Sequence, residues 1–361
     1  MLDYFFGGSV KKRLCLFIAL MTLLSGCSFQ EKTQEDIKTK EVTFAEDNCY
    51  KYHYQQLNKK QKKLYQELFH MFVNIETEGK ISDKNMKDVD LVHNAILNDH
   101  PELFYVDTEI VYSDCRVEIE YLFKKKQIKQ YQKEIEEETD MILNEILQDN
   151  QYEQMLYLYN YVVSHLQYNE DAKYNQTIIS SFINKETVCT GYAKKLQYLY
   201  QKIGIETTQI TGTCIDENNL VQRHAWNMIK YNNDYYYIDA TWGDREDKNM
   251  ILYEYFIFSS QDMLKIYTPE DHYENTIEEQ YNYFTKNNLY FTQYHFSSLA
   301  QGVNKEKKIF TARFSDDIYE YVKNRVKNTN DAFDILSKAG LQVDYIQYWY
   351  DDNFNVITMI W

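Results

Sequence analysis

Residues 187–244 constrain this chain most, because they place a thiol, an imidazole and a carboxylate within one short segment. Cys189 comes first, His224 follows, and Asp239 closes the set. A cysteine nucleophile needs a neighbouring base, and the base needs a group that holds its ring in one orientation. The three residues therefore predict a Cys-His-Asp site, provided that the fold brings them together.

The segment after Cys189 predicts a helix. Its apolar residues recur at helical spacing, and Gly204 marks the end of the pattern, as a C-terminal glycine does. Cys189 is thus expected at or just before the helix N-terminus. The unpaired amides and the dipole of a helix favour a thiolate over a thiol at that position.

The segment that carries the other two residues predicts a β-hairpin. His224 opens a strand, Asn232-Asn233-Asp234 form a turn, and residues 235–239 return as the second strand. If the chain reverses at 232–233, His224 and Asp239 lie near each other across two antiparallel strands. The carboxylate could then hold the imidazole in one tautomer while the other ring nitrogen faces a sulfur.

Three motifs in this stretch resemble the transglutaminase-like superfamily, which has a papain-like cysteine fold. They are Val-Cys-Thr-Gly-Tyr-Ala at 188–193, His-Ala-Trp-Asn at 224–227 and Asp-Ala-Thr-Trp-Gly-Asp at 239–244. The resemblance covers about residues 155–260 and implies an α+β fold in which a nucleophile helix packs on an antiparallel sheet. It also implies Cys189 as nucleophile, His224 as general base and Asp239 as the orienting acid. Because the superfamily contains transglutaminases, peptidases, deamidases and members without demonstrated activity, the substrate stays open.

Three aromatic residues are candidates for supporting roles. Trp226 and Trp242 flank His224 and Asp239 in the sequence, either as core packing or as a wall that excludes water from the charged pair. Tyr168 is a candidate for lining an oxyanion site. The backbone amide of Cys189 is the stronger candidate for oxyanion donor, since it lies at the predicted helix start.

The amino terminus predicts export and lipid attachment. Residues 1–26 combine the basic cluster Lys11-Lys12-Arg13 with an apolar run that is short for a membrane span, as in a signal peptide. Leu24-Ser25-Gly26-Cys27 resembles the bacterial lipobox, which implies a lipid on Cys27. We expect a protein anchored to the extracytoplasmic face of the cell membrane, with residues 27–48 as a polar tether.

The chain after residue 48 is predicted to form three domains. Residues 49–150 predict an accessory α+β domain, because amphipathic helices alternate there with short strand patterns. Residues 151–268 correspond to the transglutaminase-like domain. Residues 269–361 predict a small α/β unit with a strand, two helices and a final hairpin, and carry no catalytic motif.

Charge and ligand spacing limit the partners. The net charge of −16 disfavours binding to nucleic-acid phosphates. The sequence contains no C-x-x-C or H-x-x-x-H pair, so we expect neither a metal nor another cofactor. The expected partner is a protein or peptide substrate, for which a cell-wall peptide is one choice. The alternative is a non-catalytic binding or scaffold lipoprotein built on the same module. Whether Cys49 and Cys115 form a disulfide stays open.

Overall fold

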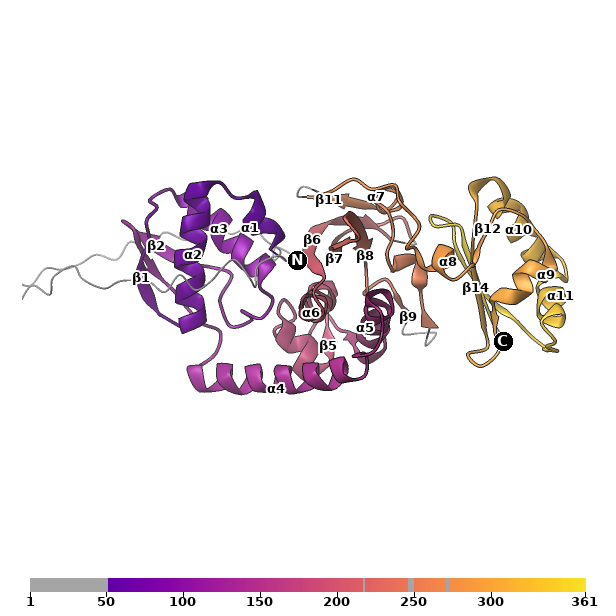
Figure 1. Ribbon diagram of the computed structural model, residues 1–361, viewed down its shortest axis with the longest axis horizontal. Coiled ribbons are helices and arrows are strands. Elements are labelled where there is room, and N and C mark those ends of the chain that lie inside the picture. The colour runs from indigo at the N-terminus through magenta and orange to yellow at the C-terminus, as the bar shows by residue number, and fades with distance from the viewer. Residues whose placement is uncertain (1–50, 217, 246–249, 271–272) are drawn as a thin grey trace, which may run out of the picture. The chain divides into compact units, whose positions relative to one another are not determined.

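The computed structural model describes residues 51–216, 218–245, 250–270 and 273–361 (Figure 1). The described residues divide into two compact units, one made of residues 51–97 and 105–122 and one made of Asn98–Phe104 with the described residues from Phe123 to Trp361. The predicted signal segment, Cys27 and the tether lie outside the described residues. In the part of the chain that is described, no helix has the combined length and apolarity that crossing a bilayer requires.

The first unit combines helices with a small antiparallel sheet. Its elements are α1 (Tyr52–Gln56), α2 (Lys59–Asn74), β1 (Glu78–Lys80), most of α3 (Met86–Asp99), β2 (Val111–Ser113) and β3 (Arg116–Glu118), with sheet order β1-β3-β2. A capping box starts α2, because the Asn58 side chain accepts from the Gln61 amide and the Gln61 side chain accepts from the Asn58 amide. The apolar face of α2 is buried along Leu64, Leu68 and Phe72.

The centre of the second unit is a four-stranded antiparallel sheet of order β11-β6-β7-β8. Its strands are β6 (Glu206–Ile215), β7 (Val221–Tyr231), β8 (Asp234–Ile238) and β11 (Tyr267–Pro269). The turn between β7 and β8 is made by Asn232 and Asn233, with φ of 51° and 69°. Asparagine tolerates this left-handed backbone, which suits a two-residue hairpin turn. The hairpin predicted at this point is present.

Helices complete this part of the second unit. They are α4 (Lys125–Asn144), α5 (Gln151–His165), α6 (Cys189–Lys202) and the short α7 (Ser260–Met263), with a π-helix at Ser180–Asn184 and a 3-10 turn at Tyr253–Tyr255. Four two-residue strands pair as β4 (Gln167–Tyr168) with β5 (Glu186–Thr187), and as β9 (Asp244–Arg245) with β10 (Met250–Ile251). Helix α6 is fixed to β7 by a 3.0 Å hydrogen bond from Asn227 Nδ2 to the Ala193 carbonyl. It ends before Gly204, whose φ is 80°, as the sequence predicts.

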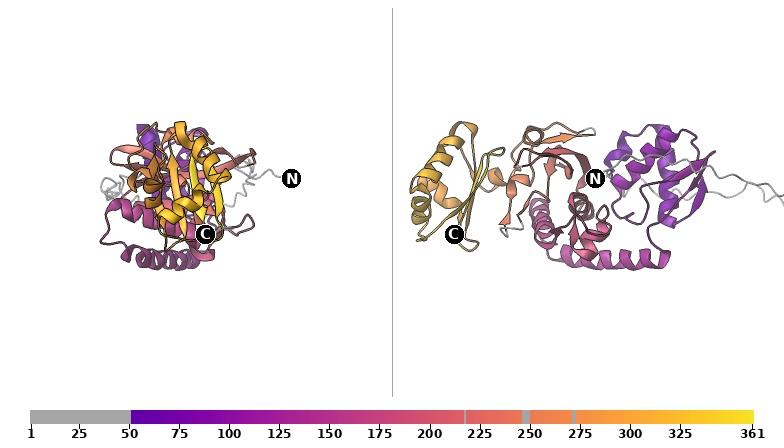
Figure 2. Two further views of the ribbon diagram at one scale, coloured as in Figure 1. Left: turned by 90° about the vertical axis from the view of Figure 1, so that its right-hand side faces the viewer. Right: turned by 180° about the vertical axis from the view of Figure 1, so that it is seen from behind.

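A second sheet forms the C-terminal part of the same unit. The elements there are α8 (Tyr283–Lys286), β12 (Tyr290–Phe291), α9 (Phe296–Leu299), a 3-10 turn (Ala300–Gly302), β13 (Val303–Asn304), β14 (Ile309–Phe314), α10 (Asp316–Asn328), α11 (Asp331–Lys338), β15 (Gln347–Asp351) and β16 (Val356–Ile360). The strand order is β12-β14-β16-β15, with β13 beside β14. Figures 1 and 2 show α9, α10 and α11 on one face of this sheet.

The other face of the C-terminal sheet contacts the central part of the unit. Arg313 on β14 makes a 3.0 Å hydrogen bond through Nη2 to Asp262 Oδ1. The Tyr255 hydroxyl donates to Asp351 Oδ2 at 3.0 Å. The ring of Phe354 packs edge-on against Phe258. The second unit therefore contains both regions that the sequence suggests as separate domains after residue 150, held together by buried polar and aromatic contacts.

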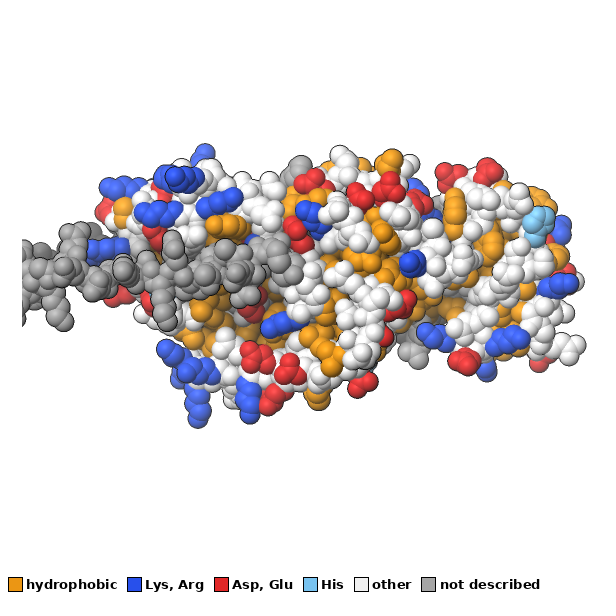
Figure 3. All heavy atoms as spheres, in the orientation of Figure 1, with side chains coloured by type: hydrophobic (Ala, Val, Ile, Leu, Met, Phe, Trp, Pro, Cys, Tyr) orange, Lys and Arg blue, Asp and Glu red, His pale blue; other side chains and the backbone are white. Residues whose placement is uncertain are grey.

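The charged side chains are mixed on the face seen in Figure 3. Lysine and arginine alternate with aspartate and glutamate over the described surface, and neither sign gathers into one large field.

Candidate active site

His224 and Asp239 meet as the hairpin predicts. The register of β7 and β8 places Asn227 opposite Ile238, so Asp239 follows the end of β8 close to His224. His224 Nε2 lies 2.6 Å from Asp239 Oδ2, and both side chains are almost fully buried. Because Asp239 occupies Nε2, the ring presents Nδ1 toward the thiol.

Cys189 is the first residue of α6 and is half-buried. Val188 precedes it in extended conformation and supplies no side-chain cap, while the Val188 carbonyl accepts from the Gly191 amide at 2.9 Å. Burial alone raises the pKa of the Cys189 thiol. Hydrogen bonding to His224, the charge of that ring and the Ala225 amide outweigh burial, and the pKa is lowered overall. The site thus favours a thiolate.

The imidazole is shifted in the opposite direction. Burial lowers the pKa of His224, but the charge of Asp239, its hydrogen bond and the neighbouring Cys189 raise the pKa to about 10. A thiol with a lowered pKa beside an imidazole with a raised pKa exchange a proton to form a thiolate–imidazolium pair. Such pairs are typical of reactive cysteines.

The Asp239 carboxylate is hydrogen-bonded on both oxygens. Oδ1 accepts from the amides of Thr241 at 2.9 Å and Trp242 at 3.1 Å. Oδ2 accepts from His224 and from the Tyr267 hydroxyl, the latter at 2.7 Å. Four donors hold a carboxylate that is 1% exposed, which fixes its position against the ring.

Aromatic rings enclose His224. Its ring centroid lies 6.1 Å from that of Trp226, 5.6 Å from that of Trp242 and 6.0 Å from that of Tyr267. Trp226 is buried, whereas Trp242 is half-buried. Both tryptophan rings lie beside the imidazole, and Trp226 also belongs to the buried core. Such a wall excludes water, and charges attract more strongly where water is excluded.

Tyr168 lies on β4, beside the strand that leads into Cys189. It pairs with Thr187, two residues before the nucleophile, and its side chain is 44% exposed. Burial of its hydroxyl and the charge of Cys189 both raise the pKa of Tyr168. The structure therefore places Tyr168 near the thiol.

Close packing explains the glycine in the Val-Cys-Thr-Gly motif. A Cβ at Gly191 would lie 1.8 Å from Thr187 Oγ1, so only glycine lets the first turn of α6 rest on β5. The Tyr192 hydroxyl, also in this turn, donates to Asp244 Oδ2 at 2.7 Å. These contacts fix the helix start to β5 and to the Asp-Ala-Thr-Trp-Gly-Asp motif.

Two residues near the triad differ in what the sequence reveals about them. Tyr267 belongs to no motif, and sequence reasoning missed it; a tyrosine in a short polar segment carries no signal for this role.

Cys214 is buried, and burial together with the charge of Asp239 raises the pKa of its thiol to about 12. Cys214 is therefore protonated and unsuited to act as a second nucleophile. Cys115, Cys189 and Cys214 are all free thiols, while Cys49 lies outside the described residues.

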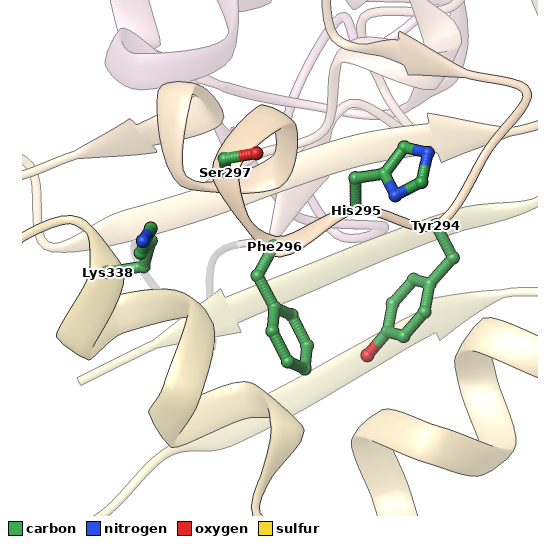
Figure 4. A pocket seen from close by; sticks show the side chains of 5 residues that line it. All are labelled: Tyr294, His295, Phe296, Ser297 and Lys338. Atoms are coloured by element: carbon green, nitrogen blue, oxygen red, sulfur yellow. The ribbon is translucent and has the colours of Figure 1, made fainter.

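Other potential sites are few in the described part of the chain. No group of three or more His, Cys, Asp or Glu residues there is arranged to hold a metal ion. A hollow of about 370 Å³ lies in the C-terminal part, lined by Tyr294, His295, Phe296, Ser297 and Lys338 (Figure 4). None of the three triad residues lines it.

One comparison with known proteins locates a family in the central segment. Residues 140–240 match the family model described as the transglutaminase-like superfamily. This match confirms the predicted resemblance and the predicted α+β class with a transglutaminase-like core. The comparison with curated proteins gives no match.

Solved structures with partial likeness include two of related description. A crystal structure of a TGase has a TM-score of 0.29 at 10% identity, covering 48% of this chain and 47% of that one. The structure described as "a Putative Cysteine Protease from Cytophaga hutchinsonii" has a TM-score of 0.27 at 16% identity, covering 32% of this chain and 40% of that one. The chain thus spans less than half of either neighbour.

Proposed function

From the premise that residues 140–240 form a transglutaminase-like core, we propose that the protein is a cysteine enzyme that transfers acyl groups at amide bonds of a protein or peptide. The observation that carries this proposal is the buried 2.6 Å contact between His224 and Asp239, beside a thiol whose pKa is lowered. A peptide of the cell wall belongs to the proposed substrate class.

The first half-reaction forms a thioester. The Cys189 thiolate attacks the carbonyl carbon of the amide, and the carbonyl oxygen becomes an oxyanion. The Cys189 amide at the start of α6 donates to that oxyanion, with Tyr168 as a second candidate donor. His224 then gives its proton to the leaving amine, the C–N bond breaks, and the acyl group remains on sulfur.

The second half-reaction releases the acyl group. Water or an amine attacks the thioester, and neutral His224 takes a proton from the attacking group. The C–S bond breaks, and the thiolate and imidazolium return. Hydrolysis and cross-linking share the first half-reaction and differ only in this acceptor.

The activated pair is tested by alkylation with iodoacetamide at pH 6.5, followed by mass spectrometry of each cysteine peptide. We expect Cys189 to label at least about ten times faster than Cys115 of the same molecule, because thiolate rather than thiol reacts. His224→Ala should slow labelling of Cys189 at least about tenfold, since burial then raises the thiol pKa with only the Ala225 amide opposing it. Labelling of Cys189 at the Cys115 rate, unchanged by His224→Ala, would refute the activated pair.

Catalysis is tested separately from thiol activation. We expect peptide thioester on Cys189 to be trapped by acid quench after incubation with glutamine-containing peptides, and Asp239→Asn to slow its formation about 1,000- to 10,000-fold. A protein whose Cys189 is reactive toward iodoacetamide but never acylated by peptides or wall fragments would instead be a binding or scaffold protein.

We further propose that Cys27 carries the lipid that anchors the protein outside the cytoplasm. The lipobox-like Leu24-Ser25-Gly26-Cys27 supports this proposal. Cells fed an alkyne fatty acid should incorporate the label into the wild-type protein, and Cys27→Ser should remove the label and release the protein from membranes. Equal labelling and membrane recovery of the two proteins would contradict it.

A further inference from the structure

The strand next to the nucleophile has one edge that is open. Strand β4 pairs in parallel with β5, through hydrogen bonds from the Gln167 amide to the Lys185 carbonyl and from the Asn169 amide to the Thr187 carbonyl, both 2.9 Å. Backbone groups of successive residues in a strand point to opposite sides. The N–H and C=O of Tyr168, which lies between these two residues, therefore point away from β5.

No further strand pairs with β4 on that side among the described residues. The sheet that contains β4 has two strands, and both residues of β4 are exposed. An edge strand with an outward N–H and C=O is a template on which another extended chain can add.

The open edge lies close to the thiol. Thr187 pairs with Tyr168, and Cys189 follows Thr187 by two residues. Adjacent strands are about 4.8 Å apart and two extended residues span about 7 Å, so the Tyr168 backbone is within about 12 Å of the Cys189 backbone. An extended chain that reached both would cross this distance with about two to four residues.

The end of the β6–β7 hairpin presents apolar side chains on the side of the sheet that faces α6. Asn227, which bonds to α6, shares this side with Ala225, whose amide faces the Cys189 sulfur, and with Val221. Ile215 pairs with Val221, and the two side chains are 41% and 68% exposed. They continue the same side of the sheet about four residues beyond Ala225 and offer exposed apolar contacts there.

We infer that the substrate is an extended polypeptide that binds as an added strand to the open edge of β4, with its main chain bonded to the N–H and C=O of Tyr168. This inference rests on the proposed function and names what that site recognises. Main-chain pairing selects an extended backbone and leaves side-chain choice to the surrounding contacts, among them Ile215 and Val221.

The length of the substrate provides the first test. Peptidyl chloromethyl ketones of one to five residues alkylate a reactive cysteine with loss of chloride, and the rate at Cys189 is followed by mass spectrometry. We expect the rate to rise at least tenfold between the one-residue and the four-residue reagent. N-methylation of one particular amide of the longer reagent should reverse that gain, while methylation of the two flanking amides should change the rate less than threefold.

Two variants at one position test the Tyr168 N–H. Tyr168→Ala removes the side chain and keeps the N–H, whereas Tyr168→Pro removes both. The ratio of long- to short-reagent rates, taken within each variant, should persist within about threefold in Tyr168→Ala and fall at least tenfold in Tyr168→Pro. If the proline variant does not fold, the N-methyl series on the wild-type protein decides alone.

The outcomes separate this inference from the proposed function. Rapid iodoacetamide labelling of Cys189 without any length or N-methyl effect overturns strand addition and leaves the activated thiol intact. Slow iodoacetamide labelling overturns the proposed function itself. A length gain that is insensitive to every N-methylation also overturns the inference, because side chains rather than backbone would then carry recognition.

Discussion

Asp239 does more at the residue scale than orient an imidazole. A carboxylate removed from water is costly unless its oxygens are hydrogen-bonded. Two of its four donors are backbone amides of the loop that follows it, and one is the Tyr267 hydroxyl from a distant strand. Asp239 thus ties β8, β7 and β11 together at one point, and the position of His224 depends on all three.

Tyr267→Phe tests this dependence while keeping the ring. The change leaves Oδ2 of Asp239 with one donor fewer inside the core, and we expect the free energy of unfolding to fall by about 1–3 kcal/mol. Thermal melting measures the loss. Tyr345→Phe is the control, because that ring is 64% exposed, and its melting temperature should match the wild type. Equal melting temperatures for all three proteins would show that the Tyr267 bond adds nothing.

Cys189, His224 and Asp239 could be predicted from the sequence because each lies inside a local motif. The hairpin then fixes the distance between His224 and Asp239, since a two-residue turn sets the register. The role of Tyr267 could not be predicted from the sequence, for a physical reason. Its role depends on β11 pairing with β6 across many intervening residues, and nothing local specifies that pairing.

A buried charge cluster supports α6 at the scale of elements. Lys195 is fully buried on this helix, and its Nζ lies 3.0 Å from Glu138 Oε1 on α4. Lys185, next to β5, also bonds to Glu138. Burial and the charge of Lys185 lower the pKa of Lys195 to about 7, while Glu138 opposes this shift. The cluster joins α4, α6 and the residue that precedes β5.

Glu138→Gln should therefore destabilise the second unit. At pH 6, below the pKa of about 7, Lys195 is charged, and the change leaves this cation without its counter-charge in a buried site, which costs about 3–5 kcal/mol when one partner of a buried pair is removed. Denaturant unfolding measures the cost. Glu137→Gln is the matched control, because that neighbouring side chain is 62% exposed and should change stability by less than 1 kcal/mol. Equal losses in the free energy of unfolding for Glu138→Gln and Glu137→Gln would show that the cluster does not stabilise the fold.

Elements with strong local patterns were the predictable ones. The α6 helix and the β7–β8 hairpin follow from apolar periodicity and turn residues. Strands of two or three residues, such as β4, β5 and β11, carry too little pattern to be recognised. Their pairing is set by the packing of the finished fold, and the open edge beside Cys189 was invisible for the same reason.

At the scale of the whole molecule, acidic groups are buried where the C-terminal sheet meets the centre of the second unit. Glu254 is 1% exposed, and neither of its carboxyl oxygens has a hydrogen-bond partner. Burial and the nearby charge of Asp351 raise the pKa of Glu254 to about 8, against the opposing charges of Arg313 and Arg245. The folded state therefore holds a proton on Glu254 that the unfolded chain gives up at much lower pH.

This proton makes stability depend on pH with a definite sign. A carboxyl pKa that is raised on folding contributes stability that is complete below the unfolded pKa of about 4.5 and is lost as pH rises toward about 8. Glu254→Gln cannot ionise, so its melting temperature should fall less than that of the wild type between pH 5 and pH 9. The difference at pH 9 corresponds to a few kcal/mol.

The control for this pH series is Glu306→Gln, which alters an exposed carboxylate. Its melting curve should follow the wild type at every pH. Parallel curves for Glu254→Gln and the wild type would mean that Glu254 is ionised in the fold as it is in water.

The contact between Tyr255 and Asp351 has a practical consequence. Tyr255 also packs edge-on against Trp242, whose ring lies beside that of His224. A fragment trimmed after residue 268 would keep both rings but lose Asp351 and Phe354, which hold the hydroxyl of Tyr255 and cover one side of its ring. Inactivity of such a truncation would then report a loosened aromatic support beside the imidazole, and it would say nothing about whether the removed sheet recruits targets.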